Sequence, residues 1–87
     1  MNVRENSMKH RTIIRVLDKT RTMTIVISSV GSQPTQVVAD YTIRDVKTKA
    51  VLDRGMAYGG FQRREDFDFD TAAALAISNA VARGKHE

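Results

Sequence analysis

Residues 70–84, DTAAALAISNAVARG, are the one segment of the chain whose pattern is typical of an α-helix. Asp70 suits the N-cap position, because its carboxylate can accept a hydrogen bond from an unpaired backbone N–H and faces the positive end of the helix dipole. Gly84 suits the left-handed position that follows a helix, with Arg83 in the last turn. The segment therefore predicts a single helix near the C-terminus.

The predicted helix has two apolar faces. With about 100° of rotation per residue, one stripe is expected to pack on the rest of the fold. This stripe comprises Ala73, Ala74, Ile77, Ala80, Val81 and Gly84. Leu75 lies almost opposite the stripe, and no charged residue occurs between Thr71 and Val81, which is unusual for a face in contact with solvent. We interpret the second face as a partner-binding surface, formed by Leu75, Ala72, Asn79 and Ala82.

The acidic stretch before the helix, EDFDFD (65–70), has the D-x-D-x-D spacing of a calcium loop. Counted from Asp66, however, the sixth position is Thr71 where such a loop needs glycine, and the twelfth is Ile77 where it needs glutamate. We therefore predict no metal site. The acids are expected to face solvent beside the helix start, while Phe67 and Phe69 close the end of the core.

The residues before this stretch have the alternation of β-strands. The expected strands are 12–17, 22–30, 36–46 and 50–58, separated by turn-like segments that include Pro34. The residues expected to face the core are Met23, Ile25 and Ile27 in the second strand, Val37, Ala39, Tyr41 and Ile43 in the third, and Ala50, Leu52, Met56 and Tyr58 in the fourth. Gly55 is expected to mark a bulge or a close approach of backbone.

These elements predict the α+β class, with a four-stranded antiparallel β-meander and one C-terminal α-helix packed on one face. The strand connections are too short for the crossovers that parallel strands require. We expect residues 1–9 to form a flexible tail and residues 10–87 to form a single small domain, because a chain of 87 residues has room for only one.

Composition sets further limits. The chain has no cysteine, so disulfides and cysteine-based zinc sites are excluded. No apolar run approaches the roughly 18 residues that a membrane helix needs, and the charged first residues lack a hydrophobic segment of signal-peptide length. We therefore expect a soluble, cytoplasmic protein without membrane association. The net charge of +4 comes mainly from residues 1–21, which keeps nucleic acid among the candidate partners.

Little in the sequence points to catalysis. There is no cysteine nucleophile, and the two histidines, His10 and His86, lie near the ends of the chain. None of the common nucleotide-binding, hydrolase or metalloprotease motifs is present. We predict that the protein is not an enzyme and that it uses neither a cofactor nor a small-molecule substrate.

One helix cannot cover both faces of a four-stranded sheet, and the core of so short a chain is thin. We therefore expect a homodimer or a stable complex with another protein. The first functional hypothesis is a small, non-enzymatic interaction protein that binds and modulates or inhibits a larger macromolecule, as accessory proteins carried by phages do.

The alternative hypothesis is a basic nucleic-acid-binding module. The segment RGMAYGGFQRR (54–64) combines arginines, aromatic rings and paired glycines, as surfaces that bind single-stranded nucleic acid do. The residues predicted for this function are Lys9, Arg11, Arg15, Arg54, Tyr58, Phe61, Arg63 and Arg64.

Overall fold

The computed structural model describes residues 10–29 and 35–85. The predicted tail of residues 1–9, the loop around Pro34 and His86 lie outside these ranges. The described elements follow one another as β1 (His10–Val16), β2 (Arg21–Ser29), β3 (Gln36–Asp45), β4 (Val51–Gly60), the short 3-10 helix η2 (Arg64–Asp66) and α1 (Phe69–Lys85).

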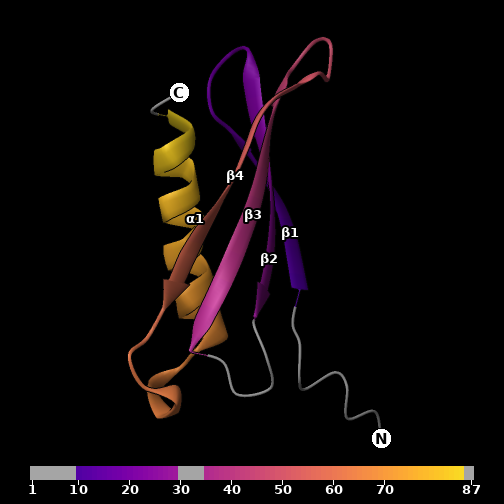
Figure 1. Ribbon diagram of the computed structural model, residues 1–87. Coiled ribbons are helices and arrows are strands. Elements are labelled where there is room, and N and C mark those ends of the chain that lie inside the picture. The colour runs from indigo at the N-terminus through magenta and orange to yellow at the C-terminus, as the bar shows by residue number, and fades with distance from the viewer. Residues whose placement is uncertain (1–9, 30–34, 86–87) are drawn as a thin grey trace, which may run out of the picture.

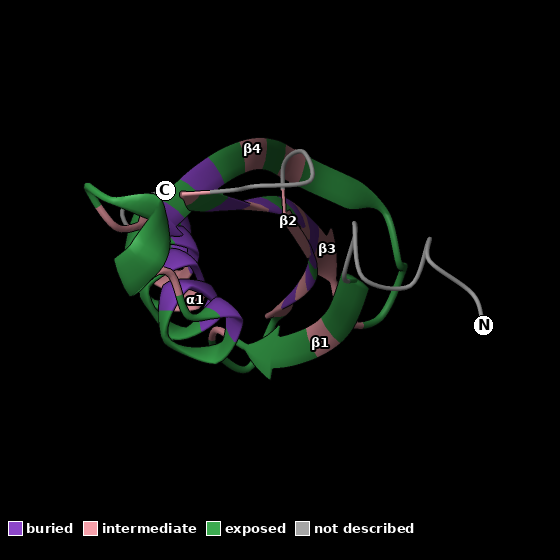
Figure 2. Ribbon diagram, turned by 90° about the horizontal axis from the view of Figure 1, so that it is seen from below, coloured by how far each residue is buried: buried purple, intermediate pink, exposed green. Residues whose placement is uncertain are grey.

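The four strands form one open antiparallel sheet in the order β1-β2-β3-β4 (Figure 1). The sheet is strongly curved, and α1 lies against its concave side (Figure 2). The helix packs mainly on β4 and β3 and less on β2. This arrangement confirms the predicted α+β meander with a C-terminal helix on one face. We call the helix-covered side of the sheet the inner face and the opposite side the outer face.

The core lies between the inner face and α1. Alternate residues of β2 and β3 point into it, as predicted, and each is at most 5% exposed: Met23, Ile25, Ile27, Val37, Ala39, Tyr41 and Ile43. Removing each large aliphatic side chain from water contributes about 1.5–3 kcal/mol to folding. The two central strands therefore supply most of the bulk of the core.

The prediction of which β4 residues face the core is wrong. Leu52, Met56 and Tyr58 are 52%, 44% and 49% exposed, respectively. The residues of β4 that face inward are small: Gly55, Ala57 and Gly59. The phase of β4 is therefore the opposite of the one that hydrophobicity alone indicates.

The reason is the close approach of α1 to β4 at Gly59. A Cβ atom on Gly59 would lie 2.6 Å from the backbone nitrogen of Ala76 and 2.8 Å from Cβ of Leu75, closer than real atoms approach. It would also overlap the carbonyl oxygen of Ala72. Because helix backbone rests on the strand here, bulky side chains do not fit on this face and occupy the outer one.

Gly55 has a different neighbour. A side chain there would overlap the ring of Tyr41, which lies on the glycine from the opposite residue of β3. Of the two roles predicted for Gly55, close approach is therefore the one observed. The register shift of the sheet occurs between Ile43 and Arg44, whose partners in β4 are Asp53 and Val51, so that Leu52 is the additional residue.

The buried stripe of α1 is rotated from the one predicted. Its fully buried alanines are Ala72, Ala73, Ala76 and Ala80. Ile77 and Val81 are only partly buried, and Ala74 is exposed. The prediction that Ala72 lies on an outer, partner-binding face is therefore wrong, because the short distance between helix and sheet brings the alanine-rich side inward.

Gly84 also has a different role from the predicted one. It lies within α1, which continues to Lys85, and its backbone is not in the left-handed conformation. A Cβ atom at this position would overlap the end of the Met23 side chain and lie 3.3 Å from Cδ1 of Leu17. Gly84 therefore allows the last turn of the helix to rest on the core.

The helix begins at Phe69 and is capped by Asp68, two residues before the predicted cap. Its carboxylate oxygen Oδ2 accepts hydrogen bonds from the backbone nitrogen and the hydroxyl of Thr71, at 2.9 and 2.7 Å. Its carbonyl accepts the first helical bond, from the nitrogen of Ala72 at 2.9 Å. Asp70, the predicted cap, instead forms an ion pair with Arg11 of β1 at 2.7 Å.

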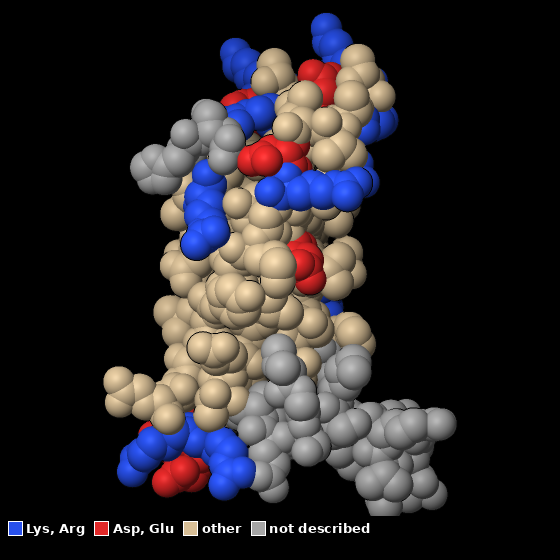
Figure 3. All heavy atoms as spheres, in the orientation of Figure 1, with Lys and Arg blue, Asp and Glu red and all other residues tan. Residues whose placement is uncertain are grey.

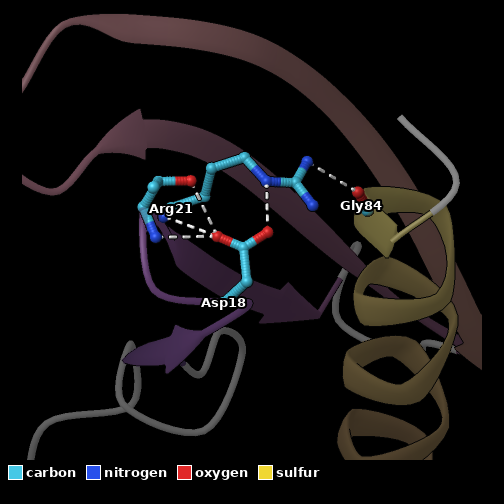
Figure 4. A network of polar contacts seen from close by, with 4 residues as sticks. Asp18, Arg21 and Gly84 are labelled. Carbon is cyan, nitrogen blue, oxygen red and sulfur yellow. Dashed lines mark hydrogen bonds and ion pairs between the residues drawn. The ribbon is translucent and has the colours of Figure 1, made fainter.

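The other end of the helix is held by the turn between β1 and β2. Arg21 donates one hydrogen bond to the Gly84 carbonyl at 3.3 Å and another to Oδ2 of Asp18 at 2.9 Å (Figure 4). The other carboxylate oxygen of Asp18 accepts from the backbone nitrogens of Thr20 and Arg21, each at 2.9 Å. One guanidinium thus links the turn to a helix carbonyl that lacks a partner within the helix.

Candidate functional site

The outer face of the sheet carries apolar side chains on three neighbouring strands, β2, β3 and β4. Val38 of β3 lies directly opposite Tyr58 of β4, while Val26 of β2 and Met56 of β4 lie on either side of Asp40. Val26 is 40% exposed, similar to Met56 and Tyr58. We call Val26, Val38, Met56 and Tyr58 the outer apolar patch. Apolar side chains grouped in this way, on a sheet face that no helix covers, are typical of a binding surface.

The charged residues lie mostly elsewhere. Figure 3 shows a broad middle zone of the molecule with few charged side chains, while most lysine, arginine and acidic residues gather toward its two ends. Because few charged groups lie in the middle zone, its removal from water by a partner costs little desolvation free energy.

A groove of about 400 Å³ adjoins the patch, between the free edge of β4 and α1. It is lined by Ala57, Tyr58, Asn79, Ala82 and Arg83. The side-chain nitrogen of Asn79 donates to the carbonyl oxygen of Tyr58 at 2.7 Å, so this carbonyl points away from β3 and toward the helix. Backbone groups two residues apart in a strand point the same way, so Met56 also presents its N–H and C=O at this edge.

Three of the four residues predicted for partner binding on the helix remain at the surface. Leu75 is 46% exposed, and Asn79 and Ala82 are exposed residues that line the groove. Ala72 is fully buried and does not belong to this surface. The groove therefore joins the predicted helix face to the outer apolar patch around the edge of β4.

Two of the arginines predicted to bind nucleic acid are already paired. Arg11 binds Asp70, and its guanidinium carbon lies 5.3 Å from the centre of the Phe69 ring. Arg63 lies 2.9 Å from a carboxylate oxygen of Asp66 and 3.9 Å from one of Glu65. Their charges are therefore largely compensated within the molecule.

The other members of that predicted set do not form one surface. Arg15 lies on the inner face of β1, opposite Met23, whereas Arg54 lies on the outer face of β4, opposite Thr42. Phe61 is partly buried and packs edge-on against Phe67 with ring centres 6.2 Å apart. Tyr58 belongs to the outer apolar patch, Arg64 lies in η2, and Lys9 is outside the described residues.

The three alternating aspartates have three separate partners, since Asp66 binds Arg63, Asp68 caps α1 and Asp70 binds Arg11. Within residues 10–29 and 35–85, no group of three or more histidine, cysteine, aspartate or glutamate residues is placed to hold a metal ion. The acidic stretch therefore serves the start of the helix, as the sequence indicated, although through a different cap.

One cluster of charge was not predicted from the sequence. The β1–β2 turn, the β3–β4 turn and the end of α1 meet at one end of the molecule, where the nitrogen of Val46 donates to the Thr20 carbonyl at 2.8 Å and Arg21 reaches Gly84. Five exposed cations gather there: Lys19, Lys47, Lys49, Arg83 and Lys85. We call this set the basic end. The sequence signal that could have predicted it is the presence of lysine in both the β1–β2 and the β3–β4 turn, which lie on the same side of a meander.

The acids at this end bind the turns. Hydrogen bonds from the Thr20 backbone and the Arg21 side chain lower the pKa of Asp18 to about 2. The N–H groups of Thr48 and Lys47 donate to Asp45 at 2.9 and 2.8 Å and hold its pKa below its ordinary value. Both carboxylates therefore stay ionised and shape the turns.

No protein-family model matches this chain, and neither a curated protein nor a solved structure matches it. In the part of the chain that the structure describes, no helix combines the length and the apolar character needed to cross a membrane.

Proposed function

We propose that this chain is a small, non-enzymatic interaction protein that binds and modulates a larger protein through the surface around β4. The observation that carries the proposal is the outer apolar patch, which continues across the edge of β4 through Tyr58 into the groove lined by Asn79 and Ala82. Partly exposed Met and Tyr side chains are enriched at the centres of protein–protein interfaces.

The surface offers two kinds of contact to a protein. The patch supplies apolar area, since four apolar side chains of three neighbouring strands lie around Asp40 on the outer face. At the edge of β4 the Tyr58 carbonyl is taken by Asn79, but the N–H and C=O groups of Met56 can bond an extended segment of the partner. An apolar surface next to an open strand edge favours a protein as the occupant over a small molecule.

A photo-crosslinking amino acid tests this proposal, because it captures whichever protein lies against the surface. Introduced in place of Tyr58, it replaces one aromatic residue by another in the middle of the surface. We expect one discrete crosslinked species in the cells of origin, which mass spectrometry would identify as another protein or a second copy of this chain. Met56→Glu in the same chain is expected to abolish the species.

The matched control carries the same crosslinker at Arg15, which is exposed on the inner face of β1 and so faces away from the outer apolar patch. A species that forms equally from Arg15 would show that the β4 surface is not the binding surface. Absence of any discrete species from Tyr58 would contradict the proposal directly. Sedimentation velocity of the purified protein, with and without Met56→Glu, separates self-association from a different partner.

A further inference from the structure

The basic end groups five exposed cations that form no salt bridge with another described residue. In the described ranges, Lys19, Lys47, Lys49, Arg83 and Lys85 form no ion pair, although each is exposed. At the opposite end, Arg11 and Arg63 each bind a carboxylate within 3 Å. Positive charge is thus compensated at the start of the helix and left uncompensated at its end.

The two nearby acids do not remove this charge. Asp18 binds Arg21 and the backbone of its own turn, and Asp45 accepts from the N–H groups of Lys47 and Thr48. Neither carboxylate forms a salt bridge with a lysine of the basic end, although the backbone hydrogen bond from Thr48 and, to a smaller extent, the charge of Lys49 lower the pKa of Asp45. Both are directed into their turns, so the ammonium groups remain available to an external anion.

Lys49 provides an independent observation. Its φ of 66° places it in the left-handed region, which glycine or asparagine would adopt at lower cost. The β3–β4 turn closes through the nitrogen of Lys49, which donates to the Asp45 carbonyl at 2.9 Å. A long charged side chain is therefore presented at a position where the backbone favours a small residue. Strain of this kind is most common at functional sites.

The position of the aromatic residues distinguishes between kinds of polyanion. The described aromatic residues lie away from the basic end. Near the end of β4 and the start of α1 are Tyr58, Phe61, Phe67 and Phe69, while Tyr41 of β3 is buried in the core. Proteins that bind single strands stack bases on aromatic rings, whereas contact with a duplex backbone needs only cations.

We propose that the basic end binds the phosphate backbone of double-stranded nucleic acid, without reading its bases. The molecule measures 43 × 29 × 15 Å along its principal axes. A duplex carries about one phosphate per 1.7 Å along its axis, so a surface as wide as the 29 Å dimension of the molecule spans enough phosphates for all five cations. This site shares Arg83 with the groove beside β4, but within it the test varies only Lys19 and Lys47, so either proposal can fail without the other.

The proposal is tested by measuring the association constant K for a labelled 20-base-pair DNA duplex, by fluorescence anisotropy between 50 and 200 mM KCl. Five phosphate contacts predict a slope of about −4.5 in log K against log salt, a loss of about 500-fold in affinity over this range. The double variant Lys19→Gln, Lys47→Gln is expected to reduce the slope to about −2.7, a loss of about 40-fold. Lys19→Arg with Lys47→Arg is expected to restore the original slope.

The matched control is Arg63→Gln with Arg64→Gln, which removes the same charge from the opposite end and is expected to leave the slope unchanged. An equal effect of both pairs would mean that only net charge matters and would overturn the site. So would the absence of duplex binding at 50 mM KCl. Tighter binding of a single-stranded oligonucleotide, or of anionic phospholipid vesicles, would overturn the choice of a duplex. Circular dichroism confirms that each variant is folded.

Discussion

The two faces of the sheet are built from the same strands but carry different side chains for different purposes. On the inner face, β2 and β3 contribute large buried residues such as Met23 and Ile25, and β4 contributes glycine and alanine. On the outer face, by contrast, β4 carries the large side chains Met56 and Tyr58, which stay about half exposed. The size of each side chain of β4 therefore follows the distance to α1.

This difference separates stability from binding. The helix contacts β4 through backbone and Cβ atoms, so the inner face of β4 admits no bulk and contributes by close packing. The large side chains of β4 gain little from folding, since they stay in contact with water. Substitutions on the inner face should therefore change stability, whereas those on the outer face should change association and leave the fold intact.

The largest expected effect compares the same substitution on the two faces. Met23→Ala removes a fully buried side chain and is expected to lower the free energy of unfolding by about 2–5 kcal/mol. Met56→Ala, at a residue that is 44% exposed, is expected to change it by less than about 0.5 kcal/mol. Urea unfolding of both variants measures the difference, and similar losses would show that the faces are not distinct.

A second comparison concerns the two inward glycines of β4. Gly59→Ala places a Cβ against helix backbone, which cannot move aside, and is expected to cost about 1–3 kcal/mol. Gly55→Ala meets side-chain atoms of Tyr41, and these can shift more readily than helix backbone, so the loss should be smaller. Thermal unfolding of the two variants ranks them, and the reverse order would argue against the close contact at Gly59.

The start of the helix provides a smaller test. Asp68→Ala removes the N-cap and is expected to cost about 1 kcal/mol. Asp70→Ala removes an exposed ion pair with Arg11, for which about 0.2–1 kcal/mol is typical. Chemical denaturation distinguishes the two, and a larger loss for Asp70 would return the cap to the residue that the sequence predicted.

Asp18 gives the smallest expected effect, which depends on pH. Its pKa is about 2 in the folded protein and 3.8 in the unfolded chain, so its contribution to stability is complete above about pH 4 and is lost as pH falls toward 2. Asp18→Asn should therefore lower the urea midpoint at pH 7, and the gap from the original protein should narrow by pH 2.5. A gap that is constant with pH would contradict this role.

The central part of the fold could be predicted because its residues obey a simple rule. Away from the ends of β2 and β3, the inward positions are all apolar and buried, and the outward positions are polar except for Val26 and Val38. The same rule failed in β4, where distance to the helix, and not hydrophobicity, decides which residues face inward. A sequence shows the size of a side chain but not the space that a neighbouring element leaves for it.

The candidate surfaces were predictable only in part. Leu75, Asn79 and Ala82 were correctly placed outside the core, but their connection to Tyr58 depends on the reversed phase of β4. The basic end joins Lys19, Lys47 and Lys85, which are far apart in the chain and meet only because two turns and the end of the helix share one side of the molecule.

The most direct test of the division between the two faces uses one methionine from each face, Met23 and Met56, as probes. Mild peroxide converts an accessible methionine to the sulfoxide, and peptide mass spectrometry measures the rate at each position. Met56 is expected to oxidise rapidly in the folded protein, while Met23, which is 0% exposed, stays intact until the protein unfolds. Equal rates at the two positions, or faster oxidation of Met23, would contradict the assignment of the inner face to folding and the outer face to binding.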